Sequence, residues 1–379
     1  MKLFHLADLH LGKRVNGFSM VEDQRHILAQ ILDMARQERP QAVLIAGDVY
    51  DKSVPSAEAV ELLDWFLVEL TKLGLQVLLI AGNHDSAERL AFGGRLLDRS
   101  GVYVSPVYDG SVQMVELTDE YGPVRVYLLP FLKPVHVRKA WPEAQIETYH
   151  DAVVEAVAHI ELDPALRNIL VTHQFVAGSI RCESEELSVG GTDQVSAVVF
   201  EPFDYVALGH LHSPQQAGRE TVRYAGSPLK YSFSEAKHIK SITVVELGTK
   251  GNVSLHTIAL RPRRELLELR GSYEELTCRD FYAGTGYQDA YVHLTLTDEE
   301  DIPNAMGRLR VIYPYLMKLD YDNCRTRSAG QLEDLRAAEE KTPLELFSTL
   351  FSMQNGRDMS EQQTAYLQQM IDTIWEEAL

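Results

Sequence analysis

Five short apolar segments, each followed directly or after one glycine by acidic, amide or histidine residues, constrain the fold of this chain more than any other feature. The segments contain four to six residues rich in Val, Ile and Leu, and they cover residues 3–7, 42–46, 76–81, 168–172 and 205–208. They do not alternate between apolar and polar residues, which is typical of strands that are buried on both faces. Residues 21–37 and 56–73 between them have helical patterns, so the order of elements predicts an α/β architecture.

The remaining chain predicts further parts. Residues 102–132 have extended-chain chemistry and turn residues, which indicates a second, partly antiparallel sheet. Alternating patterns at 267–269 and 292–296 and a helical stretch at 304–309 predict a small α+β domain over about 265–335. A charged run at 333–341 is typical of a linker, and capping-box spacings at 342–345 and 360–363 predict two more helices. The last helix has an apolar stripe of Leu367, Met370, Ile371, Ile374 and Trp375.

The polar residues that follow the five apolar segments are suited to binding metal ions. They are Asp8 and His10, Asp48 and Asp51, Asn83, His84 and Asp85, His173, and His210 and His212. Because ligands of open α/β sheets bind outside the carboxyl ends of the strands, we expect all five clusters to meet at one rim. Their oxygen and nitrogen donors favour Mn²⁺, Fe²⁺ or Zn²⁺ over a thiolate site. Seven ligands drawn from these ten side chains would fit two ions about 3.5–4 Å apart that share a bridging carboxylate, which we assign to Asp48.

This series of motifs resembles the calcineurin-like metallophosphoesterases over roughly residues 1–215. Residues 7–12, 82–86 and 224–235 are more closely similar to the nuclease subunits of bacterial SbcCD-type complexes. The resemblance implies a β-sandwich flanked by helices, with a small α+β capping domain and C-terminal helices. It divides the chain into a metallophosphoesterase nuclease domain at 1–264, a DNA-binding capping domain at 265–335, and a linker with C-terminal helices at 336–379.

The resemblance also implies a role for each residue of the motifs. One metal ion, most simply Mn²⁺, is held by Asp8, His10, Asp48 and His212, and a second by Asp48, Asn83, His173 and His210. His84 then stabilises the scissile phosphate or protonates the leaving oxygen, and Asp85 orients the His84 ring. Basic residues near these motifs in sequence are candidates for binding substrate phosphates, namely Lys13, Arg14, Lys52, Arg89 and Lys230.

The activity that the resemblance implies is metal-dependent cleavage of DNA in repair, recombination and replication. It comprises 3′–5′ exonuclease action on double strands and endonuclease action on single strands and hairpins. The resemblance also implies that ATP regulates this activity. The chain has no GxxxxGK[ST] loop for binding ATP, so ATP dependence has to come from a second chain. The partner that the resemblance implies is an SbcC-type coiled-coil ATPase, which we expect to dock on the C-terminal helices. A homodimer through residues 56–73 and 87–99 is implied as well. Two alternatives stay open: a nucleotide, cyclic nucleotide or phosphoprotein substrate, and a scaffold without catalytic activity.

The charge balance bears on the DNA substrate. The chain has 36 Lys and Arg against 55 Asp and Glu, a net charge of −19, which at first argues against a nucleic-acid partner. However, residues 333–379 alone contain ten acidic and three basic residues, and two divalent ions would offset part of the remainder. We therefore expect this chain alone to bind DNA weakly. Three scattered cysteines without a CxxC pair, and no apolar stretch of roughly 18 residues, predict a cytoplasmic protein with no membrane partner.

Overall fold

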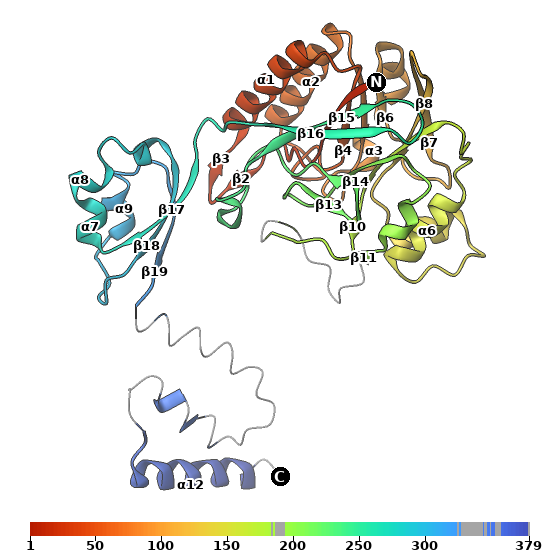
Figure 1. The fold of residues 1–379 in the computed structure, drawn as a ribbon. Helices are drawn as coiled ribbons and strands as arrows, with labels where there is room; N and C mark the ends of the chain where they lie inside the picture. Colours follow the sequence, from red (N-terminus) through yellow and green to blue (C-terminus); the bar gives the residue numbers. More distant parts are fainter. Residues whose placement is uncertain are drawn as a thin grey trace. The chain divides into compact units, whose positions relative to one another are not determined.

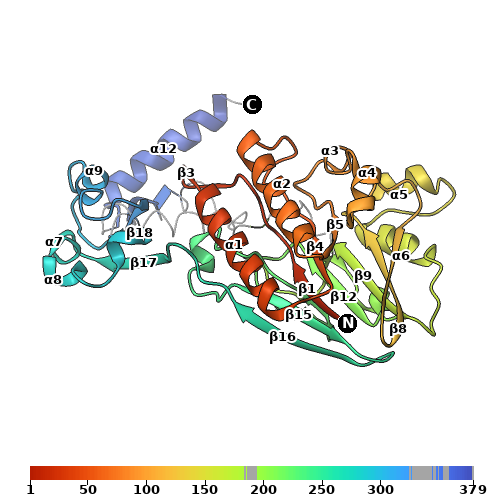
Figure 2. The same cartoon turned by 90° about the horizontal axis from the view of Figure 1, so that it is seen from above.

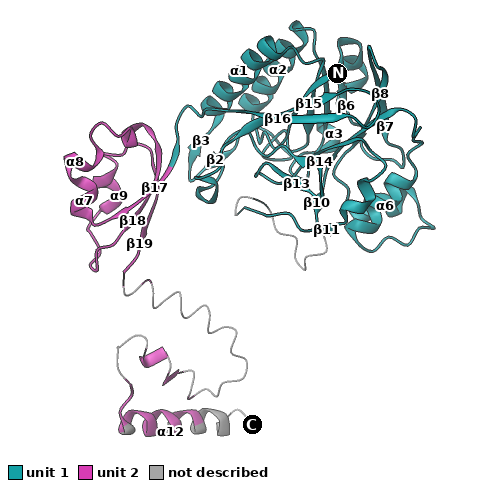
Figure 3. Ribbon diagram, viewed as in Figure 1, with its two compact units in different colours: residues 1–266 teal, residues 267–379 magenta. Residues whose placement is uncertain are grey.

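The computed structural model describes residues 1–182, 185, 194–323, 326, 344, 347–348, 350–352 and 358–377. The chain divides into two compact units, residues 1–266 and 267–379 (Figure 3). In the described part of the chain, no helix has the length and apolar character that a membrane span requires.

The first sheet of unit 1 contains the three strands that precede the first three polar clusters (Figure 1). Its strands lie in the order β16 (Val253–Ala259), β15 (Ser241–Leu247), β1 (Lys2–Leu6), β4 (Ala42–Ala46), β5 (Gln76–Ile80) and β6 (Val102–Val104). Strands β1, β4, β5 and β6 are parallel, and β15 and β16 are antiparallel to their neighbours. The carboxyl ends of β1, β4 and β5 therefore point to the same edge.

The second sheet contains the other two of these strands. Its order is β13 (Gln215–Ala217), β14 (Arg219–Tyr224), β12 (Tyr205–Gly209), β9 (Arg167–His173), β8 (Gly122–Leu129) and β7 (Gln113–Asp119). Strands β14, β12, β9 and β8 are parallel, and antiparallel hairpins close both edges. Leu44 of β4 and Val171 of β9 belong to one apolar core that the two sheets share, whereas Leu170 belongs to a second core. Both faces of these strands are thus buried, as their unbroken apolar sequences predict.

Helices cover the outer faces of the two sheets. Helices α1 (Val21–Glu38) and α2 (Ala57–Lys72) lie on the first sheet (Figure 2), and α6 (Tyr149–Ala158) packs into the second apolar core together with α5 (Pro134–Ala140). Ser56 caps α2 by accepting a hydrogen bond from the Ala59 N–H at 3.3 Å, and Gly74 follows the helix with a φ of 76°. The predicted β-sandwich flanked by helices is confirmed.

Three details differ from the prediction. The five apolar strands belong to two sheets rather than one, and residues 102–104 join the first sheet instead of the second. Residues 87–99, expected to contribute a helical contact, contain two one-turn helices, α3 (Ala87–Leu90) and α4 (Gly94–Leu97), before a 3₁₀ turn at Asp98–Ser100. Shorter elements of the unit include β2 (Arg14–Val15), β3 (Phe18–Ser19), β10 (Phe175–Val176) and β11 (Gln194–Val195).

Unit 2 is a small α+β fold. Its sheet has the order β17 (Leu266–Gly271), β18 (Tyr291–Leu296) and β19 (Leu316–Tyr321), and it is accompanied by α7 (Tyr273–Thr277), α8 (Arg279–Tyr282) and α9 (Ala305–Leu309). Alternate residues of β18, namely Val292, Leu294 and Leu296, are fully buried in its core. The helix α12 (Glu361–Glu377) starts at the predicted capping box, in which the Ser360 N–H donates to Gln363 Oε1 at 2.9 Å.

Some predictions for the C-terminal part fall outside the described residues. These are the linker at 333–341, the helix start at 342–345 apart from Leu344, and the side chains of Ile374 and Trp375.

Candidate metal centre

All seven predicted metal ligands lie together at the carboxyl ends of five strands. Asp8 and His10 follow β1, Asp48 follows β4 and Asn83 follows β5 in the first sheet, whereas His173, His210 and His212 come from β9 and the end of β12 in the second. All except the half-buried Asn83 are at most 8% exposed. The site therefore spans the edge of the sandwich, where two sheets each contribute donors.

The backbone at this edge is strained. Of the seven non-glycine residues with positive φ in the described ranges, four are predicted ligands: Asp8 (53°), His10 (44°), Asp48 (47°) and His210 (105°). Each such residue costs about 1–3 kcal/mol, and conformations of this kind cluster at functional sites. Backbone hydrogen bonds hold the strained loops together, with the His10 N–H donating to the Asp48 carbonyl at 2.9 Å and the Asp8 N–H to the Gly47 carbonyl at 3.1 Å.

Two glycines let the strand ends approach each other. A Cβ atom on Gly82 would collide with the carboxylate and backbone of Asp48, and one on Gly209 would collide with the Ala46 carbonyl oxygen. Any larger residue would push the Asp48 loop or the second sheet outward, so glycine is required at both positions.

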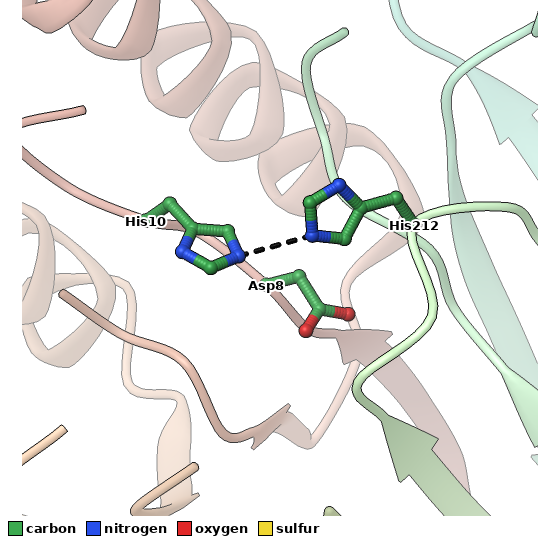
Figure 4. A group of neighbouring side chains, drawn as sticks. All are labelled: Asp8, His10 and His212. Atoms are coloured by element: carbon green, nitrogen blue, oxygen red, sulfur yellow. Dashed lines mark hydrogen bonds between the residues drawn. The ribbon is translucent and has the colours of Figure 1, made fainter. Parts of the chain in front are cut away.

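Asp8, His10 and His212 form one group of donors (Figure 4), and their ligand atoms all lie within 4.8 Å of one another. The Nε2 atoms of His10 and His212 are 3.1 Å apart. Two nitrogen ligands bound about 2.1 Å from one ion, at roughly a right angle, have this separation. Asp8 Oδ2 is buried and has no hydrogen-bond partner among the described residues. A buried oxygen without a partner is rare, and a cation would satisfy it.

Asn83, His173 and His210 form a second group. Asn83 Oδ1 lies 3.0 Å from His173 Nε2 and 3.1 Å from His210 Nδ1. Asp48 Oδ2 lies 3.4 Å from His173 Nε2 and 3.7 Å from His10 Nε2, so this oxygen faces a donor of each group. The residues present thus fit divalent cations with mixed oxygen and nitrogen ligands.

Burial controls the charges at the centre. Burial raises the pKa of Asp8 to about 7, lowers that of His210 to about 3 and lowers that of His10 well below its ordinary value. Burial also disfavours charge on Asp48 and His173, but their ion pair outweighs it, raising the pKa of His173 to about 9 and holding that of Asp48 well below its usual range. Neutral His10 and His210 therefore have lone pairs available for a metal ion.

His84 and Asp85 do not form the predicted pair. The His84 Nδ1–H donates to the Asp51 carbonyl at 3.0 Å, so that Nε2 faces the site, 3.9 Å from Asp48 Oδ2. The Asp85 carboxylate instead accepts the N–H groups of Val49, Tyr50 and Gly82 at 2.8–3.0 Å. The prediction that Asp85 orients the His84 ring is wrong, because the turns after β4 and β5 direct three backbone N–H groups at Asp85. Asp85 holds these two turns together.

The predicted phosphate-binding residues differ in their surroundings. Lys13 Nζ lies 2.6 Å from Asp51 Oδ1, which in turn lies 3.8 Å from His10 Nδ1, so this ammonium is close to the donors. Arg14, Lys52 and Arg89 have exposed side chains, and Arg14 donates to the Gly17 carbonyl. Lys230 is engaged elsewhere, with Nζ 2.7 Å from both the Ala236 carbonyl and Glu265 Oε2.

Residues that the sequence pattern does not indicate also lie beside the centre, among them Gln24, Glu185 and Arg181. Gln24 Nε2 donates to the His10 carbonyl at 2.7 Å, and Glu185 Oε1 accepts the His212 N–H at 2.6 Å. The Arg181 guanidinium lies 3.5 Å from the ring centroid of Phe175, whose ring is 6.2 Å from that of His210. None of the three belongs to a cluster that follows a strand, so the pattern that predicts the metal ligands gives no signal for them.

The chain is similar to known proteins both by family models and by individual relatives. Residues 1–214 match the model of the calcineurin-like phosphoesterase family, and residues 262–355 match the type 5 capsule protein repressor C-terminal domain. A curated relative from Staphylococcus epidermidis, which is named as a subunit of the nuclease SbcCD, is 34% identical over 323 residues, covering 84% of this chain and 85% of the relative. A relative of the same name from Staphylococcus saprophyticus is 30% identical over 383 residues, covering 100% and 99%. Among solved structures, a dimetal phosphatase from Danio rerio has a TM-score of 0.42 at 12% identity, covering 69% of this chain and 98% of that one, and we draw no conclusion from it.

Proposed function

Because the chain belongs to the calcineurin-like phosphoesterase family and, within it, to the nuclease subunits of SbcCD, we propose that it hydrolyses DNA phosphodiester bonds with two divalent metal ions as one component of a complex. The observation that carries this proposal is the meeting of seven oxygen and nitrogen donors at the strand ends, with Asp48 Oδ2 facing a donor of each group. A single ion would leave several of these buried donors unused.

We assign one ion to Asp8, His10, Asp48 and His212, and the other to Asp48, Asn83, His173 and His210. The separations of 3.0–3.1 Å between donors within each group support this division. We propose Mn²⁺ as the metal, since carboxylate, amide and imidazole ligands suit it. When bound, the two cations polarise the phosphodiester oxygens and lower the pKa of water, so that hydroxide is available at neutral pH.

His84 acts on the substrate rather than on the metals. The Asp51 carbonyl fixes the proton of the ring on Nδ1, which leaves Nε2 directed at the site. The His84 side chain is 16% exposed, whereas Asp8 is fully buried and His10 is 1% exposed, so a phosphate can approach His84 from solvent. A protonated Nε2 can donate to the scissile phosphate or give its proton to the leaving oxygen.

The DNA substrate is supported by the relatives, which are named as nuclease subunits, and by basic side chains near the centre. Lys13 lies beside the donors and Arg14 is exposed next to it, and Arg181 lies on the Phe175 side of the centre. Reversing the charge of Lys13 and Arg14 together is expected to weaken DNA binding and to reduce the slope of log K against log salt by about 0.9 per lost phosphate contact. An unchanged slope would remove these two residues from the DNA path. We propose 3′–5′ exonuclease activity on double strands and endonuclease activity on single strands and hairpins.

An SbcC-type ATPase is the partner that we propose, and residues 336–379 are its docking segment. In α12, the apolar side chains of Leu367 and Ile371 are half-buried, whereas Tyr366 is 67% and Met370 43% exposed. Deleting residues 342–379 is expected to abolish co-purification with the ATPase while metal-dependent cleavage persists. Retained co-purification would contradict this docking site.

The proposed homodimer is supported by apolar side chains exposed on α2, on α4 and between α3 and α4. Phe92, between α3 and α4, is 87% exposed and Leu96 is 78% exposed, and Val60 and Val68 on α2 are 45% and 40% exposed. Contiguous exposed apolar patches mark interaction surfaces, and Phe92 and Leu96 are the most exposed of these four side chains. We propose that a second copy of this chain covers them.

One assay separates the candidate functions. A labelled hairpin duplex and a generic phosphomonoester are incubated with Mn²⁺, with and without the ATPase. The proposal predicts cleavage of the hairpin and little action on the phosphomonoester. Action on the phosphomonoester alone would favour a nucleotide or phosphoprotein substrate, and action on neither substrate would favour a scaffold.

A further inference from the structure

The segment between β14 and β15 contains buried polar residues that the proposed chemistry does not use. It includes all but the first residue of the 224–235 motif described above. Glu235 and Ser227 are fully buried, and Lys240 is 4% exposed. Acidic and basic side chains are almost never buried to this extent unless they are paired. These charges are therefore expected to be paired with neighbouring polar groups.

Both charged residues contact His212. Glu235 Oε1 lies 3.3 Å from His212 Nδ1, and Glu235 Oε2 lies 2.5 Å from Lys240 Nζ. Lys240 Nζ also donates to the His212 carbonyl and to Ser227 Oγ, each at 2.8 Å. One buried ion pair thus holds the ring and the main chain of a single proposed metal ligand.

From these contacts we infer that Glu235 is a positioning residue that fixes His212 in its metal-binding tautomer, and that Lys240 holds the Glu235 carboxylate for this task. A carboxylate oxygen beside an ammonium group accepts hydrogen bonds, so the proton of the imidazole lies on Nδ1. The lone pair is then on His212 Nε2, the atom that faces His10 Nε2 at 3.1 Å (Figure 4). The inference rests on the proposed metal centre.

The same segment also supports His10, the other imidazole of this donor group. The Tyr231 hydroxyl donates to the Leu9 carbonyl at 2.5 Å and accepts from Gln24 Nε2 at 3.1 Å. Gln24 Nε2 donates in addition to the His10 carbonyl. The segment after β14 therefore contacts His212 directly, and it contacts His10 through Gln24.

In the second donor group, a ring nitrogen of His173 has a different kind of hydrogen-bond partner. His173 Nδ1 has the neutral Ala46 carbonyl as its partner, at 2.8 Å. A carboxylate partner makes an imidazole a more basic ligand than a carbonyl partner does, and loss of such a partner typically weakens metal affinity 10–100-fold. Removing the charge of Glu235 should therefore weaken one of the two ions selectively.

The test is a calorimetric titration of the metal-free, full-length chain with Mn²⁺, comparing the wild type with Glu235→Gln. We expect one of two binding events to weaken 10–100-fold in the variant, while the other stays within threefold. If both affinities stay within threefold of the wild type, the inference is wrong. The proposed function is tested separately by the wild type, which has to bind two equivalents and cleave DNA.

A double variant separates positioning from a purely structural role. Glu235→Gln leaves the Lys240 ammonium buried without its partner, so Lys240→Met is added in a double variant. We expect the double variant to regain thermal stability without metal but to keep the weakened Mn²⁺ affinity. Restored affinity would assign the effect to the unpaired charge and overturn the inference.

The matched control is Asp119→Asn. Asp119 pairs with Arg167 at 2.5 Å, both side chains are buried, and the pair lies at the start of β9, at the other end of this strand from His173. This variant should lower the melting temperature of the metal-free protein and leave both Mn²⁺ affinities unchanged. A comparable loss of Mn²⁺ affinity here would show that any lost buried ion pair weakens the centre, which contradicts a specific role for Glu235.

Discussion

Replacing His84 with alanine is the most informative single change, because the structure allows two roles for this residue. Its ligand atom groups with those of His10 and Asp48, so that a metal ion could include it. Its greater exposure and the hydrogen bond of its Nδ1 to the Asp51 carbonyl support contact with the substrate instead. The two roles differ in what the variant does to metal content.

The expected size of the effect follows from the loss of one donor. Removing one preorganised donor to a developing oxyanion slows turnover about 10²–10³-fold, which corresponds to about 2.7–4 kcal/mol of transition-state stabilisation. The backbone N–H of His84, which donates to Asp48 Oδ1 at 3.0 Å, is retained in His84→Ala. The variant should therefore keep both metal ions and lose activity.

Two measurements distinguish metal binding by His84 from contact with the substrate. The rate of cleavage of a hairpin duplex is measured at saturating Mn²⁺, and the metal content of the purified protein is measured by elemental analysis. His150→Ala, at a half-buried histidine of α6, serves as the control and should behave as the wild type. A His84→Ala rate within threefold of the wild type, or a metal content reduced to one equivalent, would refute the assigned role.

Three further predictions concern the centre, the assembly and stability. Asp48→Ala should lower the metal content below two equivalents and abolish cleavage, because its carboxylate faces both donor groups; full retention of two equivalents by elemental analysis would exclude bridging. Phe92→Asp with Leu96→Asp should shift the chain from dimer to monomer in sedimentation equilibrium, and an unchanged mass would place the dimer contact elsewhere. The Arg167 guanidinium holds the pKa of Asp119 well below its usual range, so this ion pair contributes its full stability above the ordinary aspartate pKa of about 4 and loses it progressively at lower pH. Asp119→Asn should therefore lower the free energy of unfolding by about 3–5 kcal/mol at pH 7. In urea titrations, this difference in unfolding free energy between the variant and the wild type should become smaller below about pH 4. A difference that does not depend on pH would contradict the prediction.

The identity of the donors was predictable because it depends on local patterns. Each donor follows an apolar strand directly, or lies within four residues of it, and parallel strands bring their carboxyl ends to one edge whatever their order. The small α+β fold and the start of α12 were predictable for the same reason, since alternation and a capping box are properties of neighbouring residues. The resemblance in motifs then led to the family that the comparisons identify.

Contacts between distant segments were not predictable in this way. Asp85 follows His84 in sequence, yet its carboxylate binds the backbone of Val49 and Tyr50, which the turn after β4 brings to it. Gln24 lies inside an ordinary amphipathic helix, and nothing in that helix indicates that its amide supports His10. Hydrogen-bond partners of this kind depend on how separate elements pack.

The sequence by itself determined which side chains gather at the edge of the strands, because residue type and strand direction are local properties. Only the tertiary structure decided that these strands belong to two facing sheets, that four of the proposed ligands have a backbone with positive φ, and that a buried Glu235–Lys240 pair holds His212. The physical reason is that strain and buried charge are tolerated only where packing supplies compensating contacts, and those contacts come from segments far apart in the chain.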